Sequence, residues 1–351
     1  MMVSHNEKEN SFGETTMTAT GTHTASHTQA RTTRRTRSLR GHGRAALAAA
    51  ATGTLLASTA VAALLPAAPA GAAATGTIAA GFPAAATTGV PAGTTLKTVP
   101  GTVSSGPGWA WNSSGGYLEV SGNGATLTGL RVNGNIDVSA DNVTLNNIKL
   151  IAGGDGSMGV SLRHTSNVTI EHSTIAGLNT TSNRLMVGIK DIYGDATGTV
   201  VAGDNISKTS TAVQIYAGTI ENNYIHNPGM TTGDHVNGIT TNGDDQPLLI
   251  QHNTILNHYA QTDAIGLFQD FSTVSNVTIN DNFLAGGGYT IYGGMGSKGR
   301  SSNIVITNNT ISTMYHPTGG YYGPVADYDS TAPGNTWSAN TYTTGKTIPA
   351  P

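Results

Sequence analysis

The chain has 351 residues, of which only 11% are charged, and it contains 46 glycines and no cysteine, which excludes disulfides. Residues 1–74 hold 7 of the 17 basic and 3 of the 20 acidic residues, so residues 75–351 have 10 basic against 17 acidic residues, a net charge of −7. This acidic balance argues against nucleic acid, or an anionic membrane, as a partner held by bulk electrostatics.

The N-terminal region is typical of a secretory signal. Residues 31–44 contain six arginines, residues 45–65 are almost wholly small and apolar, and Ala70-Gly71-Ala72 follows as a small-x-small cleavage pattern. The apolar run approaches the length of a membrane span, but its Ala and Thr content makes it weakly hydrophobic. We therefore expect residues 1–74 to be an extension with a cleaved signal peptide. The mature protein is then secreted and extracellular, without stable membrane insertion.

Residues 75–120 lack the repeat that follows and predict an irregular N-terminal cap, with Pro91, Pro100, Trp109 and Trp111 among its residues. The open end of a β-solenoid exposes strand edges and core, so it needs a cover. We expect Trp109 and Trp111 to plug the core rather than to form a sugar platform.

Residues 121–351 repeat a short phrase of the form apolar-x-x-Asn-x-apolar. Its first apolar residue, the anchor, is followed five residues later by an apolar partner. The anchors are Leu127, Leu145, Ile170, Val201, Ile220, Ile250, Ile279, Ile306 and Trp337. The partners are Val132, Leu150, Ile175, Ile206, Ile225, Ile255, Leu284, Ile311 and Tyr342. A period of this kind indicates a solenoid, because one coil cannot bury its apolar side alone.

The repeating unit is β-structure. Its runs are short, rich in Val, Ile and Thr, and bounded by Gly, Asn and Asp, and they lack helical periodicity. The turn between anchor and partner contains a polar residue suited to left-handed backbone angles and to a coil-to-coil ladder of hydrogen bonds. These residues are Ser173, Asp204, Asn223, Asn253, Asn282, Asn309 and Asn340. The predicted fold is a monomeric, all-β, right-handed parallel β-helix of about nine coils.

Each coil also has a second strand whose core positions align. They are Ile189, Val213, Ile239, Ile265, Ile291 and Val325. Side chains alternate along a strand, so a polar and aromatic row must face outward, with neighbours about 4.8 Å apart. This row predicts a groove that follows a chain polymer. We expect substrate binding by Lys190, Gln214, Asn237, Asp263, Tyr289, Tyr322 and Asp327.

Ionisable residues in the loops are the candidates for catalysis. His235, beside Asp234, is a candidate general base or sugar contact whose tautomer the carboxylate would set; a local turn bond is the alternative. Lys298 and Arg300 form the basic pair of the C-terminal half and would neutralise a uronate or abstract a proton; a flexible loop is the alternative.

The adjacent carboxylates Asp244 and Asp245 are a candidate catalytic pair or calcium site, since Ca²⁺ prefers clustered oxygen ligands. An exposed turn is the alternative. Calcium is the only cofactor that the sequence suggests.

Residues 120–345 resemble the pectate-lyase-like superfamily, and in particular secreted bacterial right-handed β-helix repeat proteins. The resemblance rests on five segments: residues 81–96, 235–239, 286–294, 319–325 and 335–340. It implies polysaccharide chemistry: β-elimination by lyases, hydrolysis by polygalacturonases, or epimerisation. Asp244-Asp245 is similar to one polygalacturonase motif, but the Gly-His-Gly and Arg-Ile-Lys motifs of those hydrolases are absent.

From the groove, the loop residues and this resemblance we expect a secreted polysaccharide lyase that cleaves a uronate-containing glycan. Lys298 or Arg300 would be base or carboxylate clamp, His235 a proton shuttle, and Tyr292 a stacking or acid residue. A polygalacturonase-type hydrolase and a non-catalytic glycan-binding protein are the alternatives. These groups should converge on one face of the solenoid, together with Asp263 and Asp327.

Overall fold

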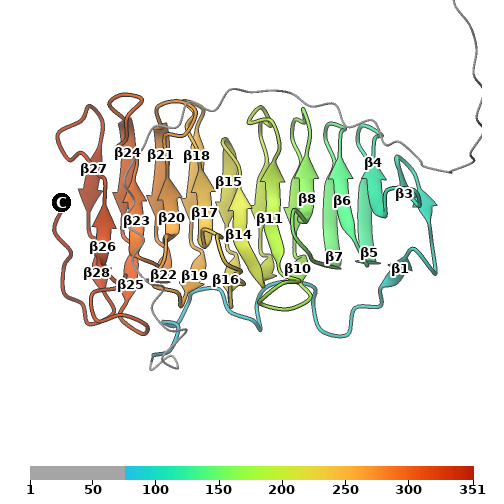
Figure 1. Cartoon of the computed structure of the whole chain (residues 1–351), viewed down its shortest axis with the longest axis horizontal. Coiled ribbons are helices and arrows are strands. Elements are labelled where there is room, and N and C mark those ends of the chain that lie inside the picture. The colour runs from blue at the N-terminus through green and yellow to red at the C-terminus, as the bar shows by residue number, and fades with distance from the viewer. Residues whose placement is uncertain (1–75) are drawn as a thin grey trace, which may run out of the picture. The chain divides into compact units, whose positions relative to one another are not determined.

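The computed structural model describes residues 76–351, which form strands and turns and no helix (Figure 1). Their strands pair in parallel from coil to coil, in a β-solenoid of about eight turns that contains the nine predicted anchors. The predicted all-β parallel β-helix is therefore confirmed. The predicted signal peptide lies outside the described residues.

The strands form two sheets, which we call sheet A and sheet B. Sheet A has 17 strands: β1 (Lys97–Val99), β5 (Thr126–Val132), β7 (Thr144–Ala152), β9 (Thr169–Glu171), β10 (Thr174–Gly177), β12 (Val200–Ala202), β13 (Asn205–Ser207), β15 (Gly218–Glu221), β16 (Tyr224–His226), β18 (Leu248–Gln251), β19 (Thr254–Asn257), β21 (Ser275–Asn280), β22 (Phe283–Gly286), β24 (Ser302–Thr307), β25 (Thr310–Ser312), β27 (Thr336–Ser338) and β28 (Thr341–Tyr342). Sheet B has 11 strands: β2 (Ser105–Gly106), β3 (Trp109–Asn112), β4 (Tyr117–Val120), β6 (Asn135–Val138), β8 (Met158–Leu162), β11 (Leu185–Asp191), β14 (Thr209–Gln214), β17 (Asn237–Thr241), β20 (Asp263–Leu267), β23 (Tyr289–Gly293) and β26 (Gly323–Ala326).

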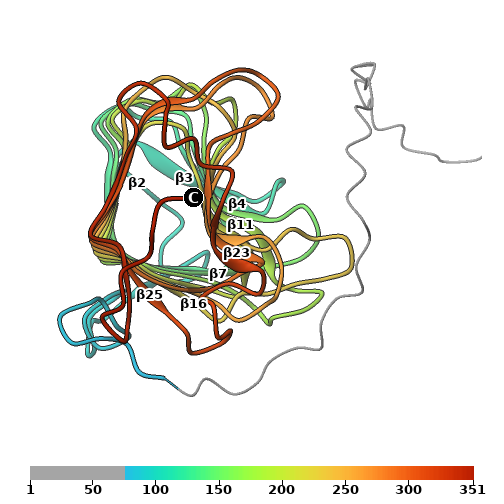
Figure 2. The ribbon, with the colours of Figure 1, turned by 90° about the vertical axis from the view of Figure 1, so that its left-hand side faces the viewer.

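The core is built from identical positions of successive coils. In sheet A each anchor pairs with the next, as in Ile250 with Ile279, and in sheet B the predicted row pairs in register, as in Ile239 with Ile265. Seen along the stack, the coils superimpose around one interior (Figure 2). Full burial of one such aliphatic side chain stabilises the fold by about 1.5–3 kcal/mol, so stacking provides what a single coil lacks.

The predicted polar ladder is present at the turn between anchor and partner strands. Every residue from Ser173 to Asn340 in this series is fully buried. Asn253, for example, accepts hydrogen bonds from the main-chain N–H (3.0 Å) and Nδ2 (2.9 Å) of Asn223 through Oδ1. Its own Nδ2 donates to the main-chain oxygen of Ile220, the anchor of the preceding coil, at 2.9 Å. The ladder joins each coil to both neighbours.

The left-handed residue of this turn lies one position earlier than the sequence suggested. Asn222, His252 and Asp281 have φ angles of 58°, 50° and 53°, whereas the buried rung residues that follow them do not have positive φ. The two tasks are separate: one exposed or half-buried residue makes the bend, and the next supplies the rung.

Both ends of the stack are covered. At the N-terminal end, β1 to β4 close the first coil, and Trp109 joins the core with 9% exposure while Trp111 packs against it. The prediction that these tryptophans plug the core is confirmed. At the other end the C-terminal segment crosses the last coil (Figure 2), where Ile348 is 2% exposed and its carbonyl accepts a hydrogen bond from Trp337 Nε1.

Residues 76–96, which we call the strap, do not cap the end but run along the side of sheet A toward β1 (Figure 1). Phe82 stacks on His252 at 5.4 Å and packs against Phe283 at 5.6 Å. Farther along, the N–H of Gly89 donates to the carbonyl of Gly203, and that of Val90 to Thr174 Oγ1. The strap therefore crosses several coils.

Candidate functional site

The outer face of sheet B has two polar rows because each strand turns two consecutive residues inward. A side chain at Gly238 would meet Ile255 in the core, and Ile239 is fully buried, so Asn237 and Thr240 flank them on the outside. The strand register aligns the residues of both rows: in the first row, Asn237 pairs with Asp263. The second row is continuous over five strands. It comprises Lys190, Gln214, Thr240, Gly266 and Tyr292.

Asp263 is the most unusual residue of this face. Its side chain is completely buried, and neither carboxyl oxygen has a hydrogen-bond partner among residues 76–351. A methyl group at Gly266 would overlap with both Asp263 Oδ2 and the ring of Phe268, so carboxyl and ring lie side by side there. Burial raises the pKa of Asp263 well above its usual range. Burial therefore favours the protonated form of this carboxyl group, which can donate a proton.

Asn237, the register neighbour of Asp263, is also incompletely paired. Its Nδ2 donates to Thr211 Oγ1 at 3.1 Å, but its Oδ1 is buried without a partner in the described part of the chain. A protonated Asp263 has an O–H group, which is a hydrogen-bond donor, and Asn237 Oδ1 lacks a donor.

Aromatic rings lie beside Asp263, and a second carboxyl, Asp327, lies near Tyr292. The ring of Tyr292 lies 5.4 Å from that of Phe268 and 5.6 Å from that of Tyr289. Burial, followed by the carboxyls of Asp263 and Asp327, raises the pKa of Tyr292 to about 12. Asp327 lies at the exposed rim, where partial burial raises its pKa.

The aromatic contacts continue to the edge of the sheet. Tyr289 contacts Tyr322 at 5.7 Å, and Tyr322 contacts Tyr321 at 4.9 Å; both of the latter rings are about half exposed. We call Asp263, Phe268, Tyr289, Tyr292, Tyr322 and Asp327 the acid cluster. Four of these were predicted as substrate-binding residues and Tyr292 as catalytic, and the structure brings them together.

Lys190 and Gln214 lie in the same outward row but away from this cluster. Lys190 Nζ donates to Gln214 Oε1 at 2.5 Å, and burial lowers the pKa of the lysine. Four coil steps separate Lys190 from Tyr292 in the row, about 19 Å at about 4.8 Å per step. The outward row therefore extends well beyond the acid cluster.

The predicted pairing of Asp234 with His235 is replaced by a different contact. Arg184, whose side chain is 2% exposed, donates to both carboxyl oxygens of Asp234 at 2.5 Å, and Ser210 adds a third bond at 2.6 Å. Burial favours a higher pKa, but these bonds hold the pKa of Asp234 below its usual value. Asp234 thus fixes its loop, and His235 is exposed before β17.

Lys298 and Arg300 do not join His235. They lie in the loop after β23, beyond the carboxyl ends of the sheet B strands, whereas His235 precedes the amino end of β17. Arg300 forms an ion pair with Asp329 at 2.7 Å and donates to Thr331 Oγ1 at 2.6 Å. The expected convergence of these three residues is therefore wrong. Their loops leave opposite edges of one sheet.

The acidic pair of the predicted calcium site forms a turn. Asp244 Oδ1 accepts hydrogen bonds from the N–H groups of Asp245 (2.6 Å) and Gln246 (2.9 Å). Residues 76–351 contain no group of three or more His, Asp or Glu side chains placed to hold a metal ion. Because Ca²⁺ needs six to eight oxygen ligands, this donor set does not fit it.

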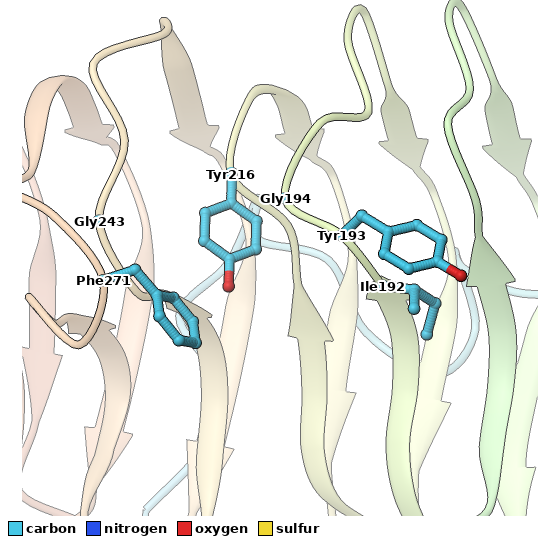
Figure 3. Close-up of a pocket in the computed structure, with 6 residues that line it drawn as sticks. All are labelled: Ile192, Tyr193, Gly194, Tyr216, Gly243 and Phe271. Carbon is cyan, nitrogen blue, oxygen red and sulfur yellow. The ribbon is translucent and has the colours of Figure 1, made fainter. Parts of the chain in front are cut away.

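A pocket of about 250 Å³, the edge pocket, lies at the carboxyl ends of the sheet B strands (Figure 3). Its lining residues are Ile192, Tyr193, Gly194, Tyr216, Gly243 and Phe271. They follow four successive strands, β11, β14, β17 and β20. Sequence analysis missed this pocket, as well as Phe268 and Arg184. Aromatic residues just after aligned strands were the available signal.

No helix in residues 76–351 is long and apolar enough to cross a membrane. No protein-family model matches the chain. No curated protein matches it either.

Two solved structures similar to the chain are those of the periplasmic alginate epimerase AlgG and of a single-residue mutant of that enzyme. The first is 12% identical, with a TM-score of 0.37, over 66% of this chain and 79% of the enzyme. The mutant is 12% identical, with a TM-score of 0.40, over 61% of this chain and 68% of the enzyme. At such low identity and TM-score, the likeness is too weak to indicate an activity for this chain.

Proposed function

We propose that the protein is a polysaccharide-active enzyme that binds a glycan along the outer face of sheet B and acts on it at the acid cluster. The observation that supports this most strongly is Asp263, a fully buried, unpartnered acid beside Tyr292 in an aromatic groove. An acid kept neutral by its surroundings is suited to protonate a leaving oxygen. The regular coil spacing suits a polymer with repeating units.

The reaction that this arrangement favours is hydrolysis of a glycosidic bond. Asp263 would give its proton to the leaving oxygen, and the exposed Asp327 would take a proton from the attacking water. Phe268 lies beside the Asp263 carboxyl, so its ring would move aside when a glycan binds. Tyr289 and Tyr322 provide faces on which sugar rings stack.

β-Elimination on a uronate is the second candidate, and the observation that favours it is Lys190. The lowered pKa of Lys190 increases the population of its neutral amine, which is the form that can abstract a proton. The side chain lies in the same outward row as Tyr292. Lys298 and Arg300 have no role in this version, because they lie beyond the carboxyl edge of the sheet.

The test is product analysis on a panel of neutral and uronate polysaccharides. Hydrolysis yields new reducing ends without ultraviolet absorbance, whereas β-elimination yields an absorbing unsaturated uronate. We expect Asp263→Asn to lower turnover about 10²–10⁴-fold, as loss of a general acid does. The control, Asp245→Asn, removes an exposed turn carboxylate and should keep full turnover. Retarded migration in glycan gels without any product would instead indicate a binding protein.

The proposal includes export, a monomeric state, a polysaccharide partner and no nucleic-acid partner, as expected from the sequence. The proposal includes no calcium requirement, because Asp244 and Asp245 supply only two carboxylates; chelation with EDTA should then leave activity unchanged. Cell fractionation and size-exclusion chromatography test the location and the oligomeric state.

A further inference from the structure

We propose that the edge pocket is a binding subsite for an uncharged sugar ring of the glycan, separate from the acid cluster. This inference rests on the proposed function, since it assigns a place to a second part of the same polymer. Four features support it: a fixed aromatic wall, a second exposed ring, a hydroxyl donor on the floor, and the local charge.

The fixed wall is Tyr193, which is 56% exposed although its position is set by neighbours. Its ring stacks on His164 at 4.1 Å with an interplanar angle of 3°, and Arg163 Nη1 donates to its hydroxyl at 3.4 Å. Asp137 holds Arg163 at 2.8 Å, and Asp195 holds His164 at 2.5 Å. An exposed ring with a settled orientation loses little entropy when a sugar stacks on it.

The opposite wall and the floor are also aromatic. Phe271 is 70% exposed, and Tyr216, only 8% exposed, lies between Phe271 and Tyr193 (Figure 3). Gly194, with a φ of 74°, lies beside the Tyr216 ring, where a Cβ would be in ordinary contact with the ring at 3.5 Å. The volume of about 250 Å³ is below the roughly 300–1,000 Å³ of pockets for drug-sized ligands, which suits a single ring.

The chemistry of the floor favours an uncharged ligand. Burial, followed by the carboxylates of Asp191, Asp270 and Asp244, raises the pKa of Tyr216 to about 12, so its hydroxyl remains a hydrogen-bond donor. Those carboxylates would repel a uronate, and none of the six lining residues is a lysine or arginine. A neutral pyranose fits this pocket, because its apolar C–H face can stack on the aromatic rings and its hydroxyls can accept a hydrogen bond from Tyr216.

The pocket is placed to bind part of a glycan that reaches the acid cluster. Phe271 follows the carboxyl end of β20, and Asp327 of the acid cluster follows the carboxyl end of β26, two coil steps farther along the same edge. Tyr193 follows β11, three coil steps from β20 in the opposite direction, about 14 Å at about 4.8 Å per step. A glycan lying parallel to the solenoid axis would therefore pass from the edge pocket to the acid cluster.

Isothermal titration of the full chain with cellohexaose, xylohexaose and mannohexaose, and with hexagalacturonate as the acidic probe, tests the inference. At least one neutral probe should bind more tightly than the acidic one. Phe271→Ala and Tyr193→Ala should each weaken that binding about tenfold, and Tyr216→Phe about threefold, for loss of one hydroxyl. The control Leu178→Ala removes a side chain of similar exposure, 57%, at the opposite edge of sheet B and should bind normally.

The subsite is overturned if no neutral probe binds, if neither alanine variant weakens binding, or if hexagalacturonate binds more tightly in a Phe271-dependent way. Asp263→Asn separates the two proposals. It should abolish turnover while the Phe271 dependence of binding remains. Full turnover in Asp263→Asn would reject the catalytic role alone, and unchanged binding in both Phe271→Ala and Tyr193→Ala would reject the subsite alone.

Discussion

The ladder turn of sheet A and the outer face of sheet B both place rows of buried polar side chains at the same position of successive coils. In the ladder, the amide of Asn282 bonds to the rungs on either side, and its Nδ2 also reaches the main chain. On sheet B, Asn237 Oδ1 and both oxygens of Asp263 lack partners in the described residues. The contrast separates polar groups that hold coils together from polar groups that remain available for a ligand.

The largest expected effect is on stability, at the ladder. Asn282→Ala should lower the free energy of unfolding by about 3–5 kcal/mol, because it removes the interior partners of the Asn253 N–H and of the Ile250 carbonyl and one bond of Asn253 Nδ2. Chemical denaturation measures the loss.

The control for Asn282 is Asn303→Gly, which removes a ladder-like bond to Asn276 at an exposed corner of the solenoid and introduces a residue that tolerates the local φ of 55°. That change should cost less than about 0.5 kcal/mol, as most surface changes do. Equal losses at the two corners would contradict the idea that burial makes the ladder structural.

Asp204 is the one acid in the ladder, and Asp204→Asn should stabilise the protein by about 1–3 kcal/mol at neutral pH. Its Oδ2 is buried and unpartnered, where the other rungs have an Nδ2 that donates to a carbonyl. Burial raises the pKa of Asp204 well above its usual value. The aspartate's contribution to stability is therefore present below the unfolded-state pKa of about 4 and is lost as pH rises through the folded-state pKa.

Thermal melts of Asp204→Asn and the parent protein between acidic and alkaline pH measure this difference. The gain in melting temperature should grow with pH and nearly vanish in acid. A gain that is constant across pH would mean that Asp204 is not held as a neutral acid.

Asp263→Asn makes the same substitution on the outer face of sheet B, so it can be compared directly with Asp204→Asn in the ladder. Burial raises the pKa of Asp263 as well, so its stability contribution is also lost with rising pH, and the asparagine should stabilise the fold by about 1 kcal/mol at neutral pH. The gain should be smaller than at Asp204, since no ladder bond is restored. Melting curves alongside turnover measurements check this; a destabilised variant would identify Asp263 as a structural group.

The smallest expected effect is at Arg300. Arg300→Ala breaks an exposed ion pair with Asp329, and neither melting temperature nor turnover should change measurably. A large loss of turnover would show that the loop of Lys298 and Arg300 takes part in the reaction, and would contradict the placement of the reaction at the acid cluster.

The solenoid and part of the acid cluster follow from local sequence, whereas the loop contacts do not. An aligned core position and the strand period place Tyr292 in the outward row. Asp263 precedes the core residue Ile265 by two, so strict alternation would point it inward; it lies outside because two consecutive residues of the strand face the core. The partner of Asp234 is Arg184, 50 residues earlier, and that of Arg300 is Asp329 in the next coil. Such contacts depend on how neighbouring loops fold against each other, which no period encodes.

The strap has a consequence for the order in which the protein forms. Its residues precede every coil in the chain, yet Phe82 packs against Phe283, about 200 residues later, and Gly76 lies against Met314. During synthesis, which starts at the N-terminus, the strap is made long before Phe283 and Met314, the residues that it contacts. The coils can grow one upon another, but Gly76 and Phe82 must wait for the late coils, so their native contacts report a nearly complete solenoid.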